Sequence, residues 1–266
     1  MLCTVNAFLL VLVLVREWKS VQVTETAREQ VIEVFVRNGI QVEKDLLPKD
    51  TALTAMTVTR DPEAEAVQAR ALLGELVPAA ESSTTYEGVD GSTAQFYPNG
   101  EFSAEFPRGK YPLNGMSPSA FALARMETMG MEAQVVEAST YGTSVTVCQM
   151  WDGLPVFTCQ ATFLFESGEL RSIQNGRRLI GTPQDAGGGE SMTVTTALLR
   201  FLDYIKSHGD ICNAITGFRE GYVLDTTQID PARLTPAWYL TTNAGTGTRT
   251  YYIDALTGEV KSESGS

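Results

Sequence analysis

The sequence has a single histidine, His208, and fewer basic residues than acidic ones. Lys and Arg number 20 against 32 Asp and Glu, which gives a formal net charge of −12 and a pI near 4.6. One imidazole excludes most metal sites and most histidine-based acid–base schemes. An acidic surface repels phosphate backbones, so we expect no nucleic-acid partner.

The sequence also lacks an apolar run of the usual membrane-spanning length. Residues Met1–Val15 are mostly apolar but include Thr4 and Asn6, whereas a spanning helix needs about 20 apolar residues, with a lower limit near 17. The unbroken apolar part of this segment comprises Ala7, Phe8, Leu9, Leu10, Val11, Leu12, Val13, Leu14 and Val15.

Three interpretations of this amino-terminal segment are open. A cleaved signal peptide would have a basic start and a small-x-small cleavage site, and neither is present. A buried core helix is the second. We favour the third, an uncleaved membrane anchor over residues 1–20 that begins upstream of Met1 and places Trp18 at the membrane interface.

The side of the membrane depends on positive charges. Arg16, Lys19 and Arg28 follow the apolar run, and by the positive-inside rule they would put the folded part in the cytoplasm. A few basic residues upstream of Met1 would reverse this orientation. We expect a single-pass plasma-membrane protein whose folded domain is extracytoplasmic.

The four cysteines are too few and too scattered for a zinc or CxxC redox site. Cys148 and Cys159 flank the turn Asp152–Pro155. A loop centred on Gly153-Leu154 would place the two thiols opposite each other, so that a disulfide could form outside the cell. The alternative is two reduced, half-buried cysteines, and a two-residue Asp152-Gly153 turn would remove the pairing.

Three helix signals recur, each ended by a glycine and each followed by β-rich sequence with a Gly-Glu-apolar turn. The helices are predicted over residues 24–38, 117–129 and 193–208, with Thr24 and Ser117 as caps and with Gly39, Gly130 and Gly209 as stops; the turns begin at Gly100, Gly168 and Gly258. A further helix over residues 62–73 would expose Glu63 and Glu65 in its first turn.

Short turns between the β-rich segments favour antiparallel pairing. The predicted class is α+β, with repeated units of one helix packed on an antiparallel β meander, preceded by an N-terminal membrane helix. The predicted parts are the anchor 1–20, a first unit 21–115 with the inserted helix, a second unit 116–183, a linker 184–191 and a third unit 192–266.

No segment carries a motif for catalysis. Gly187–Gly189 lack the surroundings of a phosphate loop, and no G-x-S-x-G sequence occurs. We therefore predict no catalytic residue, no metal or cofactor site and no small-molecule substrate. A hydrolase that uses carboxylates stays open as a third possibility.

Several segments resemble the YycI/YycH group of two-component regulatory proteins and the ends of PepSY-like modules. These segments are the short apolar start, Asn38-Gly39-Ile40, Leu47-Pro48, the Gly100-Glu101-Phe102 turn, Asp152–Phe157, Leu234–Tyr239 and Tyr251–Val260. The first segment is shorter than the full membrane helix of that family.

The resemblance implies a non-enzymatic protein, anchored by one amino-terminal helix, whose folded part lies outside a Gram-positive-type cell. It implies that a WalK-type sensor histidine kinase is the partner, with possible participation of a paralogous regulator, and that contacts between transmembrane helices contribute to regulation. The alternative is a PepSY-like envelope module that inhibits a peptidase or binds a wall component.

Overall fold

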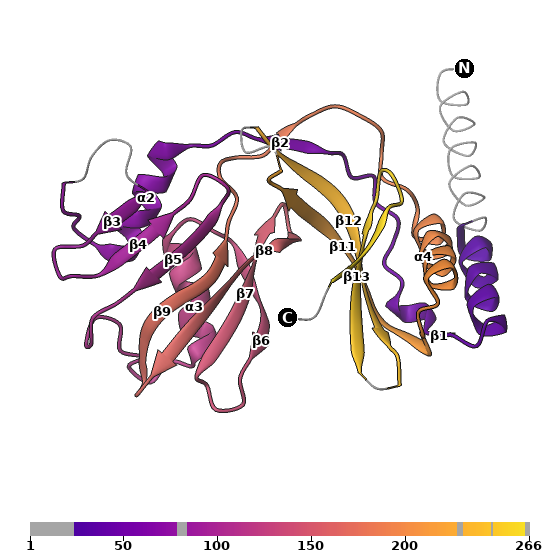
Figure 1. Ribbon diagram of the computed structural model, residues 1–266, viewed down its shortest axis with the longest axis horizontal. Helices are drawn as coiled ribbons and strands as arrows, with labels where there is room; N and C mark the ends of the chain where they lie inside the picture. The colour runs from indigo at the N-terminus through magenta and orange to yellow at the C-terminus, as the bar shows by residue number, and fades with distance from the viewer. Residues whose placement is uncertain (1–23, 79–83, 228–230, 246, 264–266) are drawn as a thin grey trace, which may run out of the picture. The chain divides into compact units, whose positions relative to one another are not determined.

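The computed structural model describes residues 24–78, 84–227, 231–245 and 247–263. It is a mixed α+β fold with mostly antiparallel strand pairing (Figure 1). Parallel pairing joins β1 (Gln41–Val42) to β11 (Ala214–Asp225), and β11 to β8 (Leu154–Glu166). The α+β class predicted from the sequence is confirmed at this level.

Cα packing divides the chain into two interleaved units. Unit 1 contains residues 1–52, 191–219 and 238–266, and unit 2 contains residues 53–190 and 220–237. The boundaries therefore differ from those of the sequential parts predicted above. Two strands, β11 and β12 (Ala232–Asn243), contribute residues to both units.

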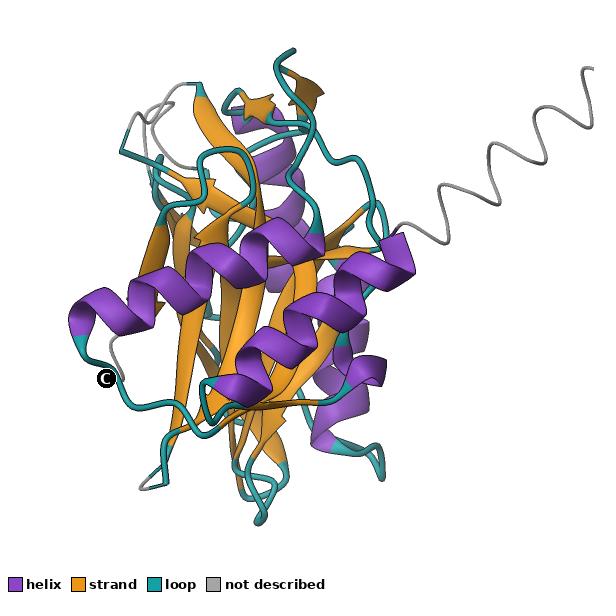
Figure 2. Ribbon diagram, turned by 90° about the vertical axis from the view of Figure 1, so that its right-hand side faces the viewer, coloured by secondary structure: helices purple, strands orange, loops and turns teal. Residues whose placement is uncertain are grey.

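Unit 1 has a core formed by two helices and the strands beneath them. The helix over residues 24–37 lies beside α4 (Val194–His208), as Figure 2 shows. Val31 and Phe35 pack with Phe201 of α4 and with Trp238 of β12. Unit 1 also contains β1, the 3-10 helix η1 (Lys44–Leu46), β13 (Thr248–Asp254) and β14 (Val260–Glu263).

Unit 2 is built on a sheet with two helices. Its elements are β2 (Met56–Val58), α2 (Pro62–Leu73), β3 (Thr85–Glu87), β4 (Thr93–Phe96), β5 (Glu101–Glu105), α3 (Pro118–Thr128), β6 (Ala133–Ala138), β7 (Ser144–Trp151), β9 (Glu169–Arg177) and β10 (Gln184–Asp185), together with β8. Both helices contribute to one apolar core with the strands, through Leu72 of α2, Met126 of α3 and Phe163 of β8 among others.

The helix ends follow local sequence signals. Asp61, Ser117 and Thr193 each accept a hydrogen bond from a main-chain N–H of the first turn, and so cap α2, α3 and α4. Gly209 ends α4 in the left-handed conformation, with φ of 69°. The predicted helix boundaries at residues 62–73, 117–129 and 193–208 are confirmed to within one residue.

The three predicted turns are also hairpins in the structure. Gly100, Gly168 and Gly258 have positive φ, and the strand pairs β4–β5, β8–β9 and β13–β14 are antiparallel. The predicted linker 184–191 differs, because Gln184 and Asp185 form β10 and pair with β2.

The described part of the chain contains no helix that is both long enough and apolar enough to cross a membrane. The predicted anchor, residues 1–20 with the apolar segment Ala7–Val15, lies outside the described residues.

Candidate functional site

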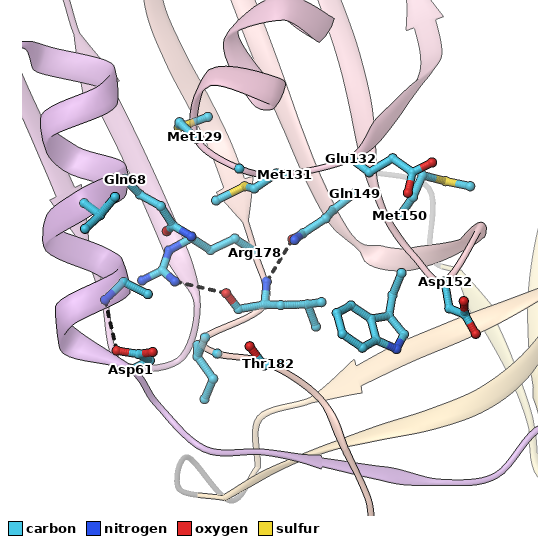
Figure 3. Close-up of a pocket in the computed structure, with 17 residues that line it drawn as sticks. Asp61, Gln68, Met129, Met131, Glu132, Gln149, Met150, Asp152, Arg178 and Thr182 are labelled. Carbon is cyan, nitrogen blue, oxygen red and sulfur yellow. Dashed lines mark hydrogen bonds between the residues drawn. The ribbon is translucent and has the colours of Figure 1, made fainter.

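A cavity of about 560 Å³ opens in unit 2 (Figure 3). Its wall comes from four segments: the first turns of α2, the connection from α3 to β6, the end of β7 with its turn, and the segment after β9. The polar wall residues include Gln68, Gln149 and Arg178, and the apolar ones include Met129 and Met131.

A helix cap, a tight turn and a side-chain hydrogen bond position these segments. Asp61 accepts a hydrogen bond from the Ala64 N–H at 2.9 Å and fixes the start of α2. Asp152 and Gly153 both have positive φ and form a two-residue turn between β7 and β8. Gln149 Oε1 accepts from the Leu179 N–H at 2.9 Å, which holds the segment after β9 against β7.

A buried ion pair lies beside the cavity. Arg178 Nη2 is 2.7 Å from Glu65 Oε1, and both side chains are 1% exposed. Arg60, at the partly exposed side, donates to the same carboxylate at 3.0 and 2.8 Å. The Arg178 guanidinium also lies 4.9 Å from the centre of the Phe96 ring, a distance at which a cation–π contact is favourable.

The environment lowers the pKa values of both Glu65 and Arg178. Burial alone would raise the pKa of Glu65, but the hydrogen bonds from Arg60 and the ion pair with Arg178 outweigh it and hold the pKa below its usual value. Burial lowers the pKa of Arg178, and Glu65 opposes that shift. The pair therefore stays charged at neutral pH and orders the wall of the cavity.

Besides Arg178 Nη2, which contacts Glu65 as an ion pair without hydrogen-bond geometry, two polar atoms near this pair have no hydrogen-bond partner among the described residues, Gln68 Oε1 and Arg178 Nε. The two side chains lie next to each other in the cavity wall (Figure 3). One atom is an acceptor and the other belongs to a donor. A neutral group that has both a hydrogen-bond donor and an acceptor, such as a carboxamide, would satisfy Gln68 Oε1 and Arg178 Nε together.

A shallow groove of about 600 Å³ adjoins the cavity. One face of α3 lines it with Ala120, Leu123, Ala124 and Glu127, and the other side is the connection Gly130–Ala133. Gly130, Met131 and Glu132 line both the cavity and the groove. The next residues belong to β6, where Val135 and Val136 are 36% and 45% exposed.

Of the two arrangements left open for Cys148 and Cys159, the structure has the reduced one. The two-residue turn at Asp152-Gly153, followed by an irregularity between Cys148 and Met150, places Cys148 opposite Gln160 instead of Cys159. Both cysteines are buried and reduced, and the Cys148 thiol donates to the Val156 carbonyl at 3.2 Å. The structure therefore has no disulfide at this position.

The Glu65–Arg178 pair was not predicted from the sequence. Glu65 was expected in solvent, but it is 1% exposed because it points towards the sheet rather than away from it. The sequence around Arg178 gives little signal, because Arg177 precedes it and only Leu179 and Ile180 are apolar after it. The predicted anchor residues Ala7–Val15 are outside the described residues.

Within the described ranges, no three His, Cys, Asp or Glu side chains come close enough to hold a metal ion. Comparison with known proteins finds no family model that matches the chain and no matching curated protein.

Solved structures with a related course of the chain do occur. An uncharacterized protein from Eubacterium rectale has 12% identity and a TM-score of 0.46, over 84% of this chain and 89% of that one. The YpeB C-terminal domain of Bacillus megaterium has 14% identity and a TM-score of 0.41, over 78% of this chain and 99% of that one. At these scores the likenesses assign neither a family nor a function.

Proposed function

We propose that this protein is a membrane-anchored, extracytoplasmic regulator that acts by binding another protein. In this proposal the partner is a WalK-type sensor histidine kinase, and residues 1–20 anchor the chain and contact the kinase within the membrane. The proposal keeps the YycI/YycH resemblance, the PepSY-like repeated helix-and-meander units and the membrane helix as its finer parts.

The observation that supports a protein-binding role is the exposed strand β6 beside the α3 groove. Among the strands that the structure describes, β6 pairs only with β7, and its two adjacent valines are exposed. Unpaired strand edges and exposed apolar residues beside a groove are typical of surfaces that bind other chains.

A second candidate function is a PepSY-like module that inhibits a peptidase or binds a component of the cell wall. The observation in its favour is the cavity, beside which Gln68 Oε1 and Arg178 Nε have no hydrogen-bond partner in the described part of the chain. A wall component rich in amide groups has the donors and acceptors that such a site requires.

Co-purification from membranes tests the first proposal. Three forms are expressed with the sensor kinase of the same genome: the full chain, the chain without residues 1–20, and a chain in which an unrelated membrane helix replaces residues 1–20. We expect the full chain to retain the kinase and to change its autophosphorylation rate. The chain without residues 1–20 should retain the least kinase and change its autophosphorylation rate the least, because it loses both the tether and the helix contacts.

The replacement form separates tethering from specific helix contacts. If it acts like the full chain, the folded part carries the recognition, and if it acts like the deletion, the native helix does. A kinase that neither co-purifies with the full chain nor changes its activity would refute the proposal. Binding of the full chain to isolated wall fragments, lost in Gln68→Met, would then support the second candidate.

A further inference from the structure

The main chain of β6 has one unpaired edge. Glu132 C=O accepts a hydrogen bond from the Met150 N–H of β7 at 2.7 Å. Successive residues of a strand direct their main-chain groups to opposite edges, so Ala133 and Val135 direct their N–H and C=O groups away from β7. These groups are available to another strand, because no described strand other than β7 pairs with β6.

The unpaired edge lies next to a place for side chains. The groove between α3 and Gly130–Ala133 has a volume of about 600 Å³. Its α3 side presents Ala120, Leu123 and Ala124, which are small or aliphatic and lie on one face of the helix at spacings of three and four. A strand added to β6 would run along this groove, and every second side chain would enter it.

The edge is short. The register between β6 and β7 shifts between Val135 and Glu137, and such an irregularity bends a strand and interrupts continuous pairing. The regular part of the edge therefore ends at Val135. A bound segment would pair over a few residues only and would depend on side-chain contacts for part of its affinity.

Charge defines the partner. Residues 126–170 contain six acidic residues and no Lys, Arg or His. This stretch includes the end of α3 and all of β6, β7 and β8, and Glu127 and Glu132 line the groove itself. A second copy of this chain would bring the same negative charges to the edge, which is unfavourable. A segment with Lys or Arg next to apolar residues is complementary to it.

We propose that the free edge of β6 receives an extended basic segment of a partner protein as an added strand, with alternate apolar side chains in the groove against α3. The inference rests on the proposed protein-binding function and names the surface and the chemistry of the partner. The mode is β-strand addition, in which main-chain hydrogen bonds supply affinity and the groove supplies selectivity.

Defined peptides test this proposal without a kinase. The probe is a fluorescent seven-residue peptide, capped at both ends, in which Val alternates with Lys and Thr. One control replaces Lys by Glu, and a second keeps the sequence but carries N-methyl groups on its main-chain amides. We expect the full-length chain to bind the lysine peptide and to bind both controls at least about tenfold more weakly.

Variants locate the site. Glu132→Lys combined with Glu137→Lys should weaken binding of the lysine peptide at least about tenfold and should strengthen binding of the Glu peptide. Glu166→Lys combined with Glu190→Lys is the matched control, since it makes the same charge change at two exposed positions outside the groove, and it should leave binding within about twofold. Ala124→Leu, which fills the groove, should also weaken binding.

Several outcomes would overturn the inference. They are equal binding of the N-methylated peptide, equal binding by the Glu132→Lys/Glu137→Lys variant, absence of binding by the unmodified chain, or a dimer of this chain that the same variant abolishes. Kinase capture by the form with the unrelated membrane helix that persists after Glu132→Lys/Glu137→Lys would refute this surface and leave the proposed function intact. Peptide binding without kinase capture would refute the kinase as partner and leave the surface intact.

Discussion

At the scale of single residues, Glu65 carries the largest expected effect on stability. Its carboxylate is 1% exposed and lies 2.7 Å from the equally buried Arg178. Removing one partner of a buried ion pair leaves an uncompensated charge and costs about 3–5 kcal/mol. We predict that Glu65→Gln lowers the free energy of unfolding by about 3 kcal/mol, measured by urea denaturation.

Glu63→Gln is the matched control, because Glu63 lies in the same first turn of α2 but is exposed. Its effect should stay within about 0.5 kcal/mol. Equal losses in the two variants would mean that the buried pair contributes no more than a surface carboxylate does.

The same pair predicts a dependence of stability on pH. The pKa of Glu65 is lower in the folded chain than in the unfolded one, so its contribution is present above the unfolded value of about 4.3 and is lost as the pH falls through the folded value. The difference in unfolding free energy between the wild type and Glu65→Gln should therefore narrow as the pH falls below about 5. A difference that stays constant over this range would contradict the assignment.

Gly176 of β9 offers a second test at this scale. A Cβ at this position would lie 2.5 Å from the Phe102 carbonyl oxygen and 2.6 Å from the Phe102 ring. We predict that Gly176→Ala destabilises the protein by about 2 kcal/mol, because the core strands β5 and β9 must move apart. In Gly189→Ala no atom lies within 4 Å of the added Cβ, so this control should leave the stability unchanged. Thermal unfolding of the two variants and the wild type measures both effects.

At the scale of elements, the caps account for much of what the sequence predicted correctly. The Ser117 side chain accepts from the Ala120 N–H at 3.2 Å at the start of α3. Ser117→Ala should lower the free energy of unfolding by about 1 kcal/mol. Ser119 is the second residue of α3. Ser119→Ala should leave the free energy of unfolding unchanged or raise it slightly, because alanine has the higher helix propensity.

Helices and hairpins were predictable because their signals are local. Asp61-Pro62, Ser117-Pro118 and Gly209 are start and stop residues that act within one turn, and Asp152-Gly153 fixes its own hairpin. The parallel pairing of β11 with β1 and β8 was not predictable, since the register Gln41↔Ala214 joins segments that share no local signal. Strand pairs of this kind depend on packing over the whole chain.

The candidate site shows the same limit. The groove and the edge of β6 arise from where α3 and β6 meet, and Glu132 or Val135 have no unusual neighbours in the sequence. The register of Cys148 and Cys159 depends on two features. The two-residue turn at Asp152-Gly153 has a local signal, whereas the irregularity between Cys148 and Met150 has none in the sequence.

At the scale of the whole molecule, the two units share the carboxyl part of the chain. Residues 191–266 supply α4 to unit 1 and also supply the β12 residues Ala232–Leu234, which pair with β2 in unit 2. The amino-terminal part likewise gives Val31 and Phe35 to the core of unit 1. Neither unit is complete within one continuous stretch of sequence.

A chain cut between Gly189 and Glu190 should therefore stay together. We predict that insertion and cleavage of a specific protease site at this exposed position gives two fragments that co-elute in gel filtration and separate only in denaturant. Fragments that elute apart without denaturant would show that the shared strands contribute little to holding the chain together.

The shared strands also affect the nascent chain. At about 5–20 residues per second, a ribosome needs roughly 2–10 seconds to pass from residue 190 to residue 237. During that interval β2 and β8 lack the partners that β12 and β11 provide, and Val58 and Val156, both 0% exposed in the finished fold, remain in contact with solvent. The newly made polypeptide thus keeps apolar strand residues unpaired until its last strands have left the exit tunnel.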